Sequence, residues 1–64
     1  MTDPGLPARQ ATAIGKGKGL TCRYEYDRAK RKFMYRFFRH GCYLGATSKP
    51  EEVVAKMTRY ATAQ

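Results

Sequence analysis

Aromatic and basic side chains interleave in one uninterrupted stretch, residues 33–39, and these residue types together can bind nucleic acid. Guanidinium groups hydrogen-bond phosphates and base edges, while aromatic rings stack on bases. With the two-residue period of a β-strand, the stretch divides into two faces. The face that suits a core carries Phe33, Tyr35 and Phe37. The face that suits a binding surface carries Met34, Arg36 and Phe38.

Neighbouring segments add further candidates for nucleic-acid contact. Residues 21–26 alternate in the same way, and their Arg23 and Glu25 share the binding side. A polar loop at 27–32 and a Gly-Lys repeat at 15–19 supply more cations. The full set of candidate nucleic-acid-binding residues is Arg23, Glu25, Arg28, Lys30, Arg31, Lys32, Met34, Arg36, Phe38, Arg39, Tyr43, Lys16 and Lys18.

The net charge favours a polyanionic partner. Thirteen Lys and Arg residues against five Asp and Glu residues give the 64-residue chain a charge of +8. The excess is local, because residues 15–43 hold nine of the basic residues and only two of the acidic ones. A field this concentrated on so small a protein attracts nucleic acid at long range. Charge that serves only solubility is the simpler alternative.

The two alternating segments are predicted to pair as antiparallel strands. The register follows from setting Tyr24 opposite Tyr35. Cys22 then lies opposite Phe37, and every core candidate meets another core candidate, as a correct register requires.

A second turn is predicted at residues 40–41, His-Gly. A two-residue hairpin loop needs positive φ at both positions, which Gly adopts freely and His tolerates better than most residues. A third antiparallel strand then follows. Its Tyr43 lies opposite Phe38, and its Leu44 opposite Phe37.

A helix is predicted after the third strand. Ser48 is a suitable N-cap with Glu51 as its capping-box partner, and Pro50 is tolerated in the first turn. The apolar stripe of this helix consists of Val53, Val54, Met57, Tyr60 and Ala61. It should cover a sheet face made of Cys22, Tyr24, Phe33, Tyr35, Phe37 and Leu44. The predicted fold is therefore α+β, a three-stranded antiparallel sheet with a C-terminal helix on one face.

The first part of the chain is expected to be irregular. Pro4, Gly5 and Pro7 interrupt regular structure, and the apolar run at 11–14 is too short to form a helix by itself. We therefore expect a flexible basic arm at 1–19 and a small sheet-plus-helix DNA-binding domain at 20–64.

Three segments carry a resemblance to known families: KFMYRF at 32–37, CYLGA at 42–46 and TSKPEE at 47–52. They resemble the three-stranded-sheet DNA-binding domain of plant ethylene-response-type transcription factors. They are also similar to the N-terminal arm-site-binding domain of phage tyrosine integrases. Both families show an aromatic-led strand, a turn, an aromatic-Leu-Gly strand and a helix that starts near Pro-Glu-Glu.

The resemblance covers about residues 20–63 and implies that the sheet lies in the major groove of DNA. It implies a groove-facing set of Arg23, Glu25, Arg36 and Tyr43. Glu25 and Gly41 depart from the plant pattern, where basic residues are usual. A phage or mobile-element protein that acts in DNA integration therefore fits better.

Neither metal binding nor catalysis is expected. Cys22, His40 and Cys42 lack the paired spacing of a zinc site, and no cofactor motif is present in the sequence. The two cysteines should lie two strand spacings apart, about 9–10 Å, which is too far for a disulfide. Glu25 and Asp27 are expected to face opposite ways, which leaves no carboxylate pair for an enzyme.

A membrane partner is not expected either, because no apolar run reaches the roughly 20 residues that a spanning helix needs. The first residues lack the features of a secretory signal. The expected location is the cytoplasm of a bacterial or phage-infected cell.

These observations predict sequence-specific or structure-selective binding of double-stranded DNA through the exposed sheet face. Two alternatives stay open. The same face could bind a host protein, as in a small phage-type inhibitor, because Arg, Tyr, Phe and Met are also enriched in protein interfaces. It could also bind RNA, since its rings would stack equally well on unpaired bases.

Overall fold

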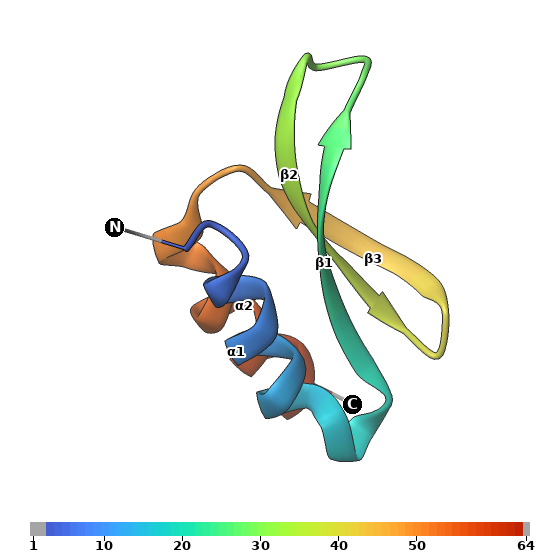
Figure 1. Ribbon diagram of the computed structural model, residues 1–64. Helices are drawn as coiled ribbons and strands as arrows, with labels where there is room; N and C mark the ends of the chain where they lie inside the picture. The colour runs from blue at the N-terminus through green and yellow to red at the C-terminus, as the bar shows by residue number, and fades with distance from the viewer. Residues whose placement is uncertain (1–2, 64) are drawn as a thin grey trace.

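Two helices pack on one side of a three-stranded antiparallel sheet in the computed structural model, which describes residues 3–63 (Figure 1). The strand order is β1-β2-β3, so β2 is central. The elements in chain order are α1 (Leu6–Gly15), the 3₁₀ turn η1 (Lys16–Lys18), β1 (Leu20–Asp27), β2 (Lys32–Arg39), β3 (Cys42–Thr47) and α2 (Pro50–Thr62). The predicted α+β class, the antiparallel sheet and the C-terminal helix are confirmed.

The pairing of β1 with β2 has the predicted register. Tyr24 lies opposite Tyr35, and Cys22 lies opposite Phe37. Strand β2 is rich in aromatic residues, which favour a pleated and half-buried surface. Because side chains alternate along each strand, this register sends one set toward the helices and the other away from them.

The pairing of β2 with β3 differs from the prediction by one residue. The turn is as expected, with φ of 49° at His40 and 84° at Gly41. Beyond the turn a β-bulge shifts the register, so that Phe37 pairs with Gly45 rather than with Leu44. The reason lies in Tyr60, whose ring packs 5.4 Å from that of Phe37.

A glycine at position 45 lets the Tyr60 side chain approach the strand closely. A Cβ at position 45 would lie 2.8 Å from the hydroxyl oxygen of Tyr60. Leu44, which was predicted in the core, is therefore extruded by the bulge and is partly exposed. As a result, Tyr60 of α2 packs over the centre of the sheet in the place predicted for Leu44.

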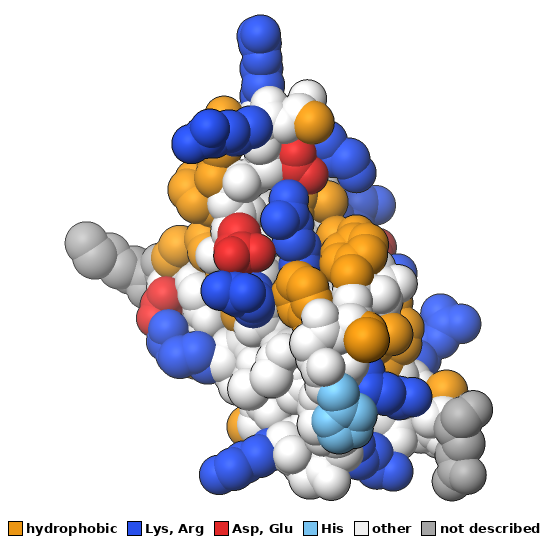
Figure 2. All heavy atoms as spheres, turned by 90° about the vertical axis from the view of Figure 1, so that its right-hand side faces the viewer, with side chains coloured by type: hydrophobic (Ala, Val, Ile, Leu, Met, Phe, Trp, Pro, Cys, Tyr) orange, Lys and Arg blue, Asp and Glu red, His pale blue; other side chains and the backbone are white. Residues whose placement is uncertain are grey.

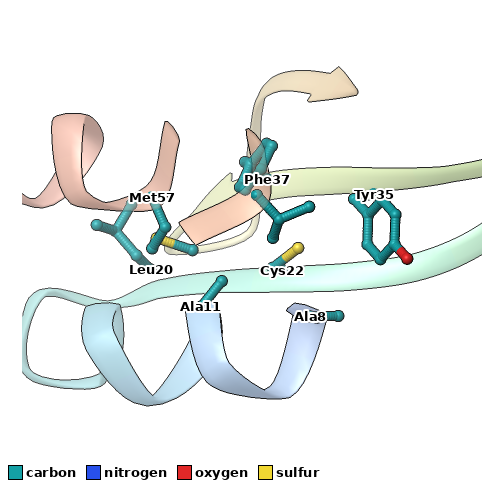
Figure 3. Packing of buried hydrophobic residues seen from close by; sticks show 8 residues of the cluster. Ala8, Ala11, Leu20, Cys22, Tyr35, Phe37 and Met57 are labelled. Carbon is teal, nitrogen blue, oxygen red and sulfur yellow. The ribbon is translucent and has the colours of Figure 1, made fainter. Parts of the chain in front are cut away.

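The core lies between the sheet and the two helices, and α1, β1, β2 and α2 contribute its buried hydrophobic side chains (Figure 3). Its largest fully buried side chains are Phe37, Leu20, Met57 and Val53. Phe37, Cys22, Tyr35, Val53 and Met57 come from the predicted core set. Leu20, Ala8 and Ala11 were not predicted, because they precede the segment in which alternation was recognised.

The start of α2 also differs from the prediction. The helix begins at Pro50, and its N-cap is Lys49 rather than Ser48, without a side-chain cap. Thr47 takes the expected polar role instead: its hydroxyl accepts a hydrogen bond from the Lys49 amide at 3.2 Å and donates to the Glu52 carboxylate at 3.4 Å. Val54, predicted in the apolar stripe, is partly exposed.

The expected flexible arm is corrected for residues 6–18, because Leu6–Gly15 form α1. Ala8, Ala11 and Gly15 are buried and spaced at helical intervals, so the helix presents a stripe of small residues to α2 and β1. A Cβ at Gly15 would lie 2.5 Å from the Leu20 Cβ. Residues 1 and 2 of the expected arm lie outside the described residues.

Thr12 fastens α1 to the edge of the sheet. Its hydroxyl accepts a hydrogen bond from the Cys22 amide at 3.0 Å and donates to the Cys22 carbonyl at 3.2 Å. Because β1 is an edge strand, these backbone groups have no partner strand on that side. The Thr12 side chain therefore satisfies the backbone amide and carbonyl of Cys22 on the open edge of the strand.

The β1–β2 hairpin projects beyond the helices (Figure 1). Phe33, which was predicted in the core, and its strand partner Tyr26 lie in this projection and are about half exposed, at 49% and 50%. Their rings pack on one another at 5.2 Å rather than beneath a helix. The register was predicted correctly, but the extent of the helical cover was not.

Candidate nucleic-acid interface

The sheet face that points away from the helices is called the open face here. By alternation and register it carries Arg23, Glu25, Asp27, Met34, Arg36, Phe38 and Tyr43. Figure 2 views this side and shows basic side chains along its length, with a few acidic and hydrophobic side chains among them. The buried Phe37 and the half-buried Arg36, neighbours on β2, lie on opposite sides of the sheet.

Two carboxylates hold the guanidinium of Arg36. The distance from Arg36 to Asp27 is 3.3 Å, and that from Arg36 to Glu25 is 3.6 Å. The expectation that Glu25 and Asp27 face opposite ways is therefore wrong, since residues two apart on a strand share a face. Glu25 also lies 3.6 Å from Arg23, which is the more exposed of the two arginines.

The pKa of Asp27 is lowered from its usual value. The main cause is a hydrogen bond that its carboxylate accepts from the Lys30 amide at 3.0 Å, and Arg36 adds to the effect. Asp27 therefore stays ionised to lower pH than a free aspartate. It keeps Arg36 oriented and at the same time fixes the start of the loop that follows β1.

Aromatic side chains occupy the other half of the open face. Phe38 and Tyr43 pack edge to face with ring centres 5.9 Å apart, and the Arg23 guanidinium lies 6.0 Å from the Phe38 ring. Tyr43 is 61% exposed. The arrangement places a cation, a half-buried ring and an exposed ring side by side, as a surface that stacks on bases requires.

Two of the predicted contact residues are not available on this face. Met34 lies on it by alternation but is only 4% exposed, so it is a filler between its neighbours and not a contact. Arg39 lies on the helix side, because it pairs with the buried Leu20. Its guanidinium donates a hydrogen bond at 2.7 Å to the carbonyl of Tyr60, near the end of α2.

Cations stand at both ends of the open face. Residues 28–32, which end with the first residue of β2, are called the tip loop. This loop closes the β1–β2 hairpin, with Arg31 in a left-handed conformation at φ 56°. Its exposed cations are Arg28, Lys30, Arg31 and Lys32. Lys16 and Lys18 are exposed in η1, at the end of the molecule opposite the tip loop (Figure 1). The predicted basic residues thus bracket the face rather than crowd one part of it.

The two cysteines have different surroundings. Cys22 is a free thiol in the core, and burial raises its pKa to about 11. Cys42 is a free thiol beside the turn after β2 and is exposed. Within residues 3–63, no group of three His, Cys, Asp or Glu side chains is arranged to hold a metal ion. In the same residues no helix is long and apolar enough to span a membrane.

Comparison with known proteins gives no relative for this chain: no family model, no curated protein and no solved structure matches it. The resemblance to integrase arm-binding domains and to ethylene-response-type domains therefore remains an expectation from short motifs.

Proposed function

We propose that this chain binds double-stranded DNA by seating the open face of its sheet in the major groove. The role would be that of an integrase arm-binding domain or of a small regulator of a phage or mobile element. The observation that carries the proposal is the composition of the one sheet face that the helices leave uncovered. It combines Arg23, Arg36 and Tyr43 with lysines and arginines at both ends.

The size of the molecule suits this placement. A β-ribbon or sheet can enter the major groove, which is about 12 Å wide. The principal extents of the protein are 32, 27 and 15 Å. The longest extent is close to one turn of B-DNA, about 34 Å. Cations at the tip loop and at η1 would then reach phosphates near the two ends of a single turn.

The ion pairs suit the two arginines of the open face to different contacts with DNA. Arg36 is held by two carboxylates and loses little further freedom when it hydrogen-bonds a base edge. Arg23 is exposed and can turn toward a phosphate. Glu25 lies between them and can accept a hydrogen bond from a cytosine amino group in the groove.

The rival function is binding of a host protein through the same face. It is favoured by the exposed Tyr43 and the partly exposed Leu44, neighbours on β3, since such apolar surface suits a protein interface. Salt separates the two functions. DNA binding weakens steeply as salt rises, because each neutralised phosphate adds about 0.9 to the slope of log K against log salt. A largely apolar protein interface responds little.

The test is a fluorescence-anisotropy titration of a labelled duplex from 50 to 200 mM salt, roughly the range in which such contacts weaken. An RNA hairpin and a single strand serve as comparison probes. Arg23→Ala should weaken duplex binding and lower the salt slope by about 1. Arg59→Ala removes the same charge from exposed α2 and is the matched control. Absence of duplex binding at low salt would refute the proposal. Tighter binding of the RNA hairpin than of the duplex would mean that the open face binds RNA and not DNA.

A further inference from the structure

A groove of about 650 Å³ lies on the other side of the sheet, where the projecting hairpin passes the beginnings of both helices. It is separate from the open face. Its lining is mostly apolar and comes from three parts of the chain, the N-terminal segment, the hairpin and the start of α2. The lining residues that matter here are Pro4, Leu6, Pro7, Tyr24, Phe33 and Tyr35.

The hairpin side of the groove is a continuous row of aromatic rings. Tyr24 is the centre of the row, with ring centres 4.7 Å from Tyr35 and 4.9 Å from Phe33. Phe33 is stacked nearly parallel to Tyr24 and continues to Tyr26. The inner end of the row belongs to the core, but Phe33 and Tyr26 are about half exposed. The outer end therefore presents ring surface that nothing in residues 3–63 covers.

The chain already lays a proline-bearing segment against the inner end of this row. The Tyr35 hydroxyl donates a hydrogen bond at 2.7 Å to the carbonyl of Pro4. Pro4 and Pro7 line the groove together with the rings. Grooves lined by aromatic rings are surfaces that bind extended proline-containing segments. The chain's own proline-containing segment therefore already packs beside these rings, as a bound proline-containing segment would.

The charges around the groove indicate what should flank the prolines. Asp3 in the lining is paired with Arg9, and Lys49 at the α2 rim is 3.7 Å from Glu52, so these charges are compensated. The tip loop, which directly precedes Phe33, differs. Its four cations form no ion pair within residues 3–63. An occupant with carboxylates at the end that meets the tip loop would complement them.

We propose that the groove binds an extended segment of another protein that contains proline and is flanked by acidic residues. The prolines would pack on Phe33 and Leu6, and the carboxylates would face the tip loop. This proposal does not depend on DNA binding, because the open face lies on the other side of the sheet. The two surfaces share only the cations of the tip loop, for which phosphates and carboxylates would compete; the aromatic rings belong to the groove alone.

The test is a titration of the ¹⁵N-labelled full chain with the peptide acetyl-EEPPLPPEE-amide, followed by amide chemical shifts. We expect shifts at Tyr24, Phe33 and Tyr35 and none at Tyr43. Two comparison peptides separate the contributions. Acetyl-KKPPLPPKK-amide reverses the charge, and acetyl-EEGGSGGEE-amide removes the prolines. Both should bind at least about tenfold more weakly.

Variants then locate the site. Phe33→Ala and Leu6→Ala change exposed groove residues on different elements and should each weaken peptide binding about tenfold. Tyr43→Ala, on the open face, is the control and should leave peptide affinity unchanged. The proposal is overturned by no shift at about 1 mM peptide, by shifts confined to the open face, or by equal binding of the charge-reversed peptide. It is also overturned if oligothymidylate occupies the groove more tightly than the peptide.

Discussion

The two faces of the sheet are built from alternate residues of the same strands, yet different interactions hold their side chains in place. The covered face is held by packing: Phe37 is fully buried in one cluster with Leu20, Val53 and Met57. The open face is held by charge: Arg36, the next residue along β2, is fixed by ion pairs at 3.3 and 3.6 Å. Buried apolar contacts therefore fix the side chains of the covered face, and ion pairs at the solvent-exposed surface fix those of the open face.

The difference implies that stability and binding can be altered separately. Substitutions on the covered face remove buried apolar area and contacts, which sets the free energy of unfolding. Substitutions on the open face remove surface ion pairs, which contribute about 0–1 kcal/mol each to stability. They should instead change affinity for DNA.

The largest effect is expected from Phe37→Ala. The variant should lose about 3–5 kcal/mol of unfolding free energy, because a fully buried ring is removed from between the sheet and α2. Urea denaturation followed by circular dichroism measures the change. Phe38→Ala, one residue along and on the open face, is the matched control and should lose much less. Equal losses would mean that the two faces are not distinct.

Arg36→Ala should weaken duplex binding by about 1–3 kcal/mol if its guanidinium reaches a base edge. Unfolding free energy should change by less than about 1 kcal/mol, as for other exposed ion pairs. Arg36→Lys keeps the charge and removes the planar fork that Glu25 and Asp27 hold. If the lysine variant binds as tightly as the parent chain, Arg36 contributes only charge.

Thr12→Val tests whether α1 belongs to the covered face. The substitution keeps the shape of the side chain but removes both hydrogen bonds to the Cys22 backbone. It should destabilise the fold by about 1–3 kcal/mol, because a part-buried amide and carbonyl lose their partners. Thermal unfolding of Thr12→Val against Thr58→Val, an exposed threonine on α2, measures the difference. No difference would mean that α1 is not docked in solution.

The cysteines report the same contrast through pH and reactivity. Cys42 should react with a thiol reagent in the native state, whereas Cys22 should react only on unfolding. Burial raises the folded pKa of Cys22 from 9.0 to about 11. Its contribution to stability is therefore complete below about pH 9 and is lost as pH rises toward about 11. Rapid labelling of both thiols at neutral pH would contradict the buried position of Cys22.

Sequence patterns were sufficient for the strands because alternation is a local property. The register that pairs Tyr24 with Tyr35 follows from matching core candidates, and the turn at 40–41 follows from backbone preferences. The position of Phe37 in the core and of Arg36 on the open face was predicted on the same basis. These features need no knowledge of the rest of the fold.

The missed features depend on contacts between distant segments. Helix α1 was not predicted because Pro7 lies in its first turn, Pro4 and Gly5 precede it, and its buried stripe is Ala8, Ala11 and Gly15, which carries little hydrophobic signal. The bulge at Leu44 depends on where Tyr60 falls. Alternation with Phe37 already places Arg39 on the helix side, but its hydrogen bond to the carbonyl of Tyr60 depends on the position of α2. No pattern within a strand contains that information.

The most direct measurement of the central claim is a ¹⁵N chemical-shift titration of the full chain with a duplex at low and at moderate salt. The account predicts shifts at Arg23, Arg36 and Tyr43 and in the tip loop, decreasing as salt rises. The amides of Val53 and Met57 in α2 should stay unchanged. Shifts that concentrate on α2, or that ignore salt, would contradict DNA binding through the open face.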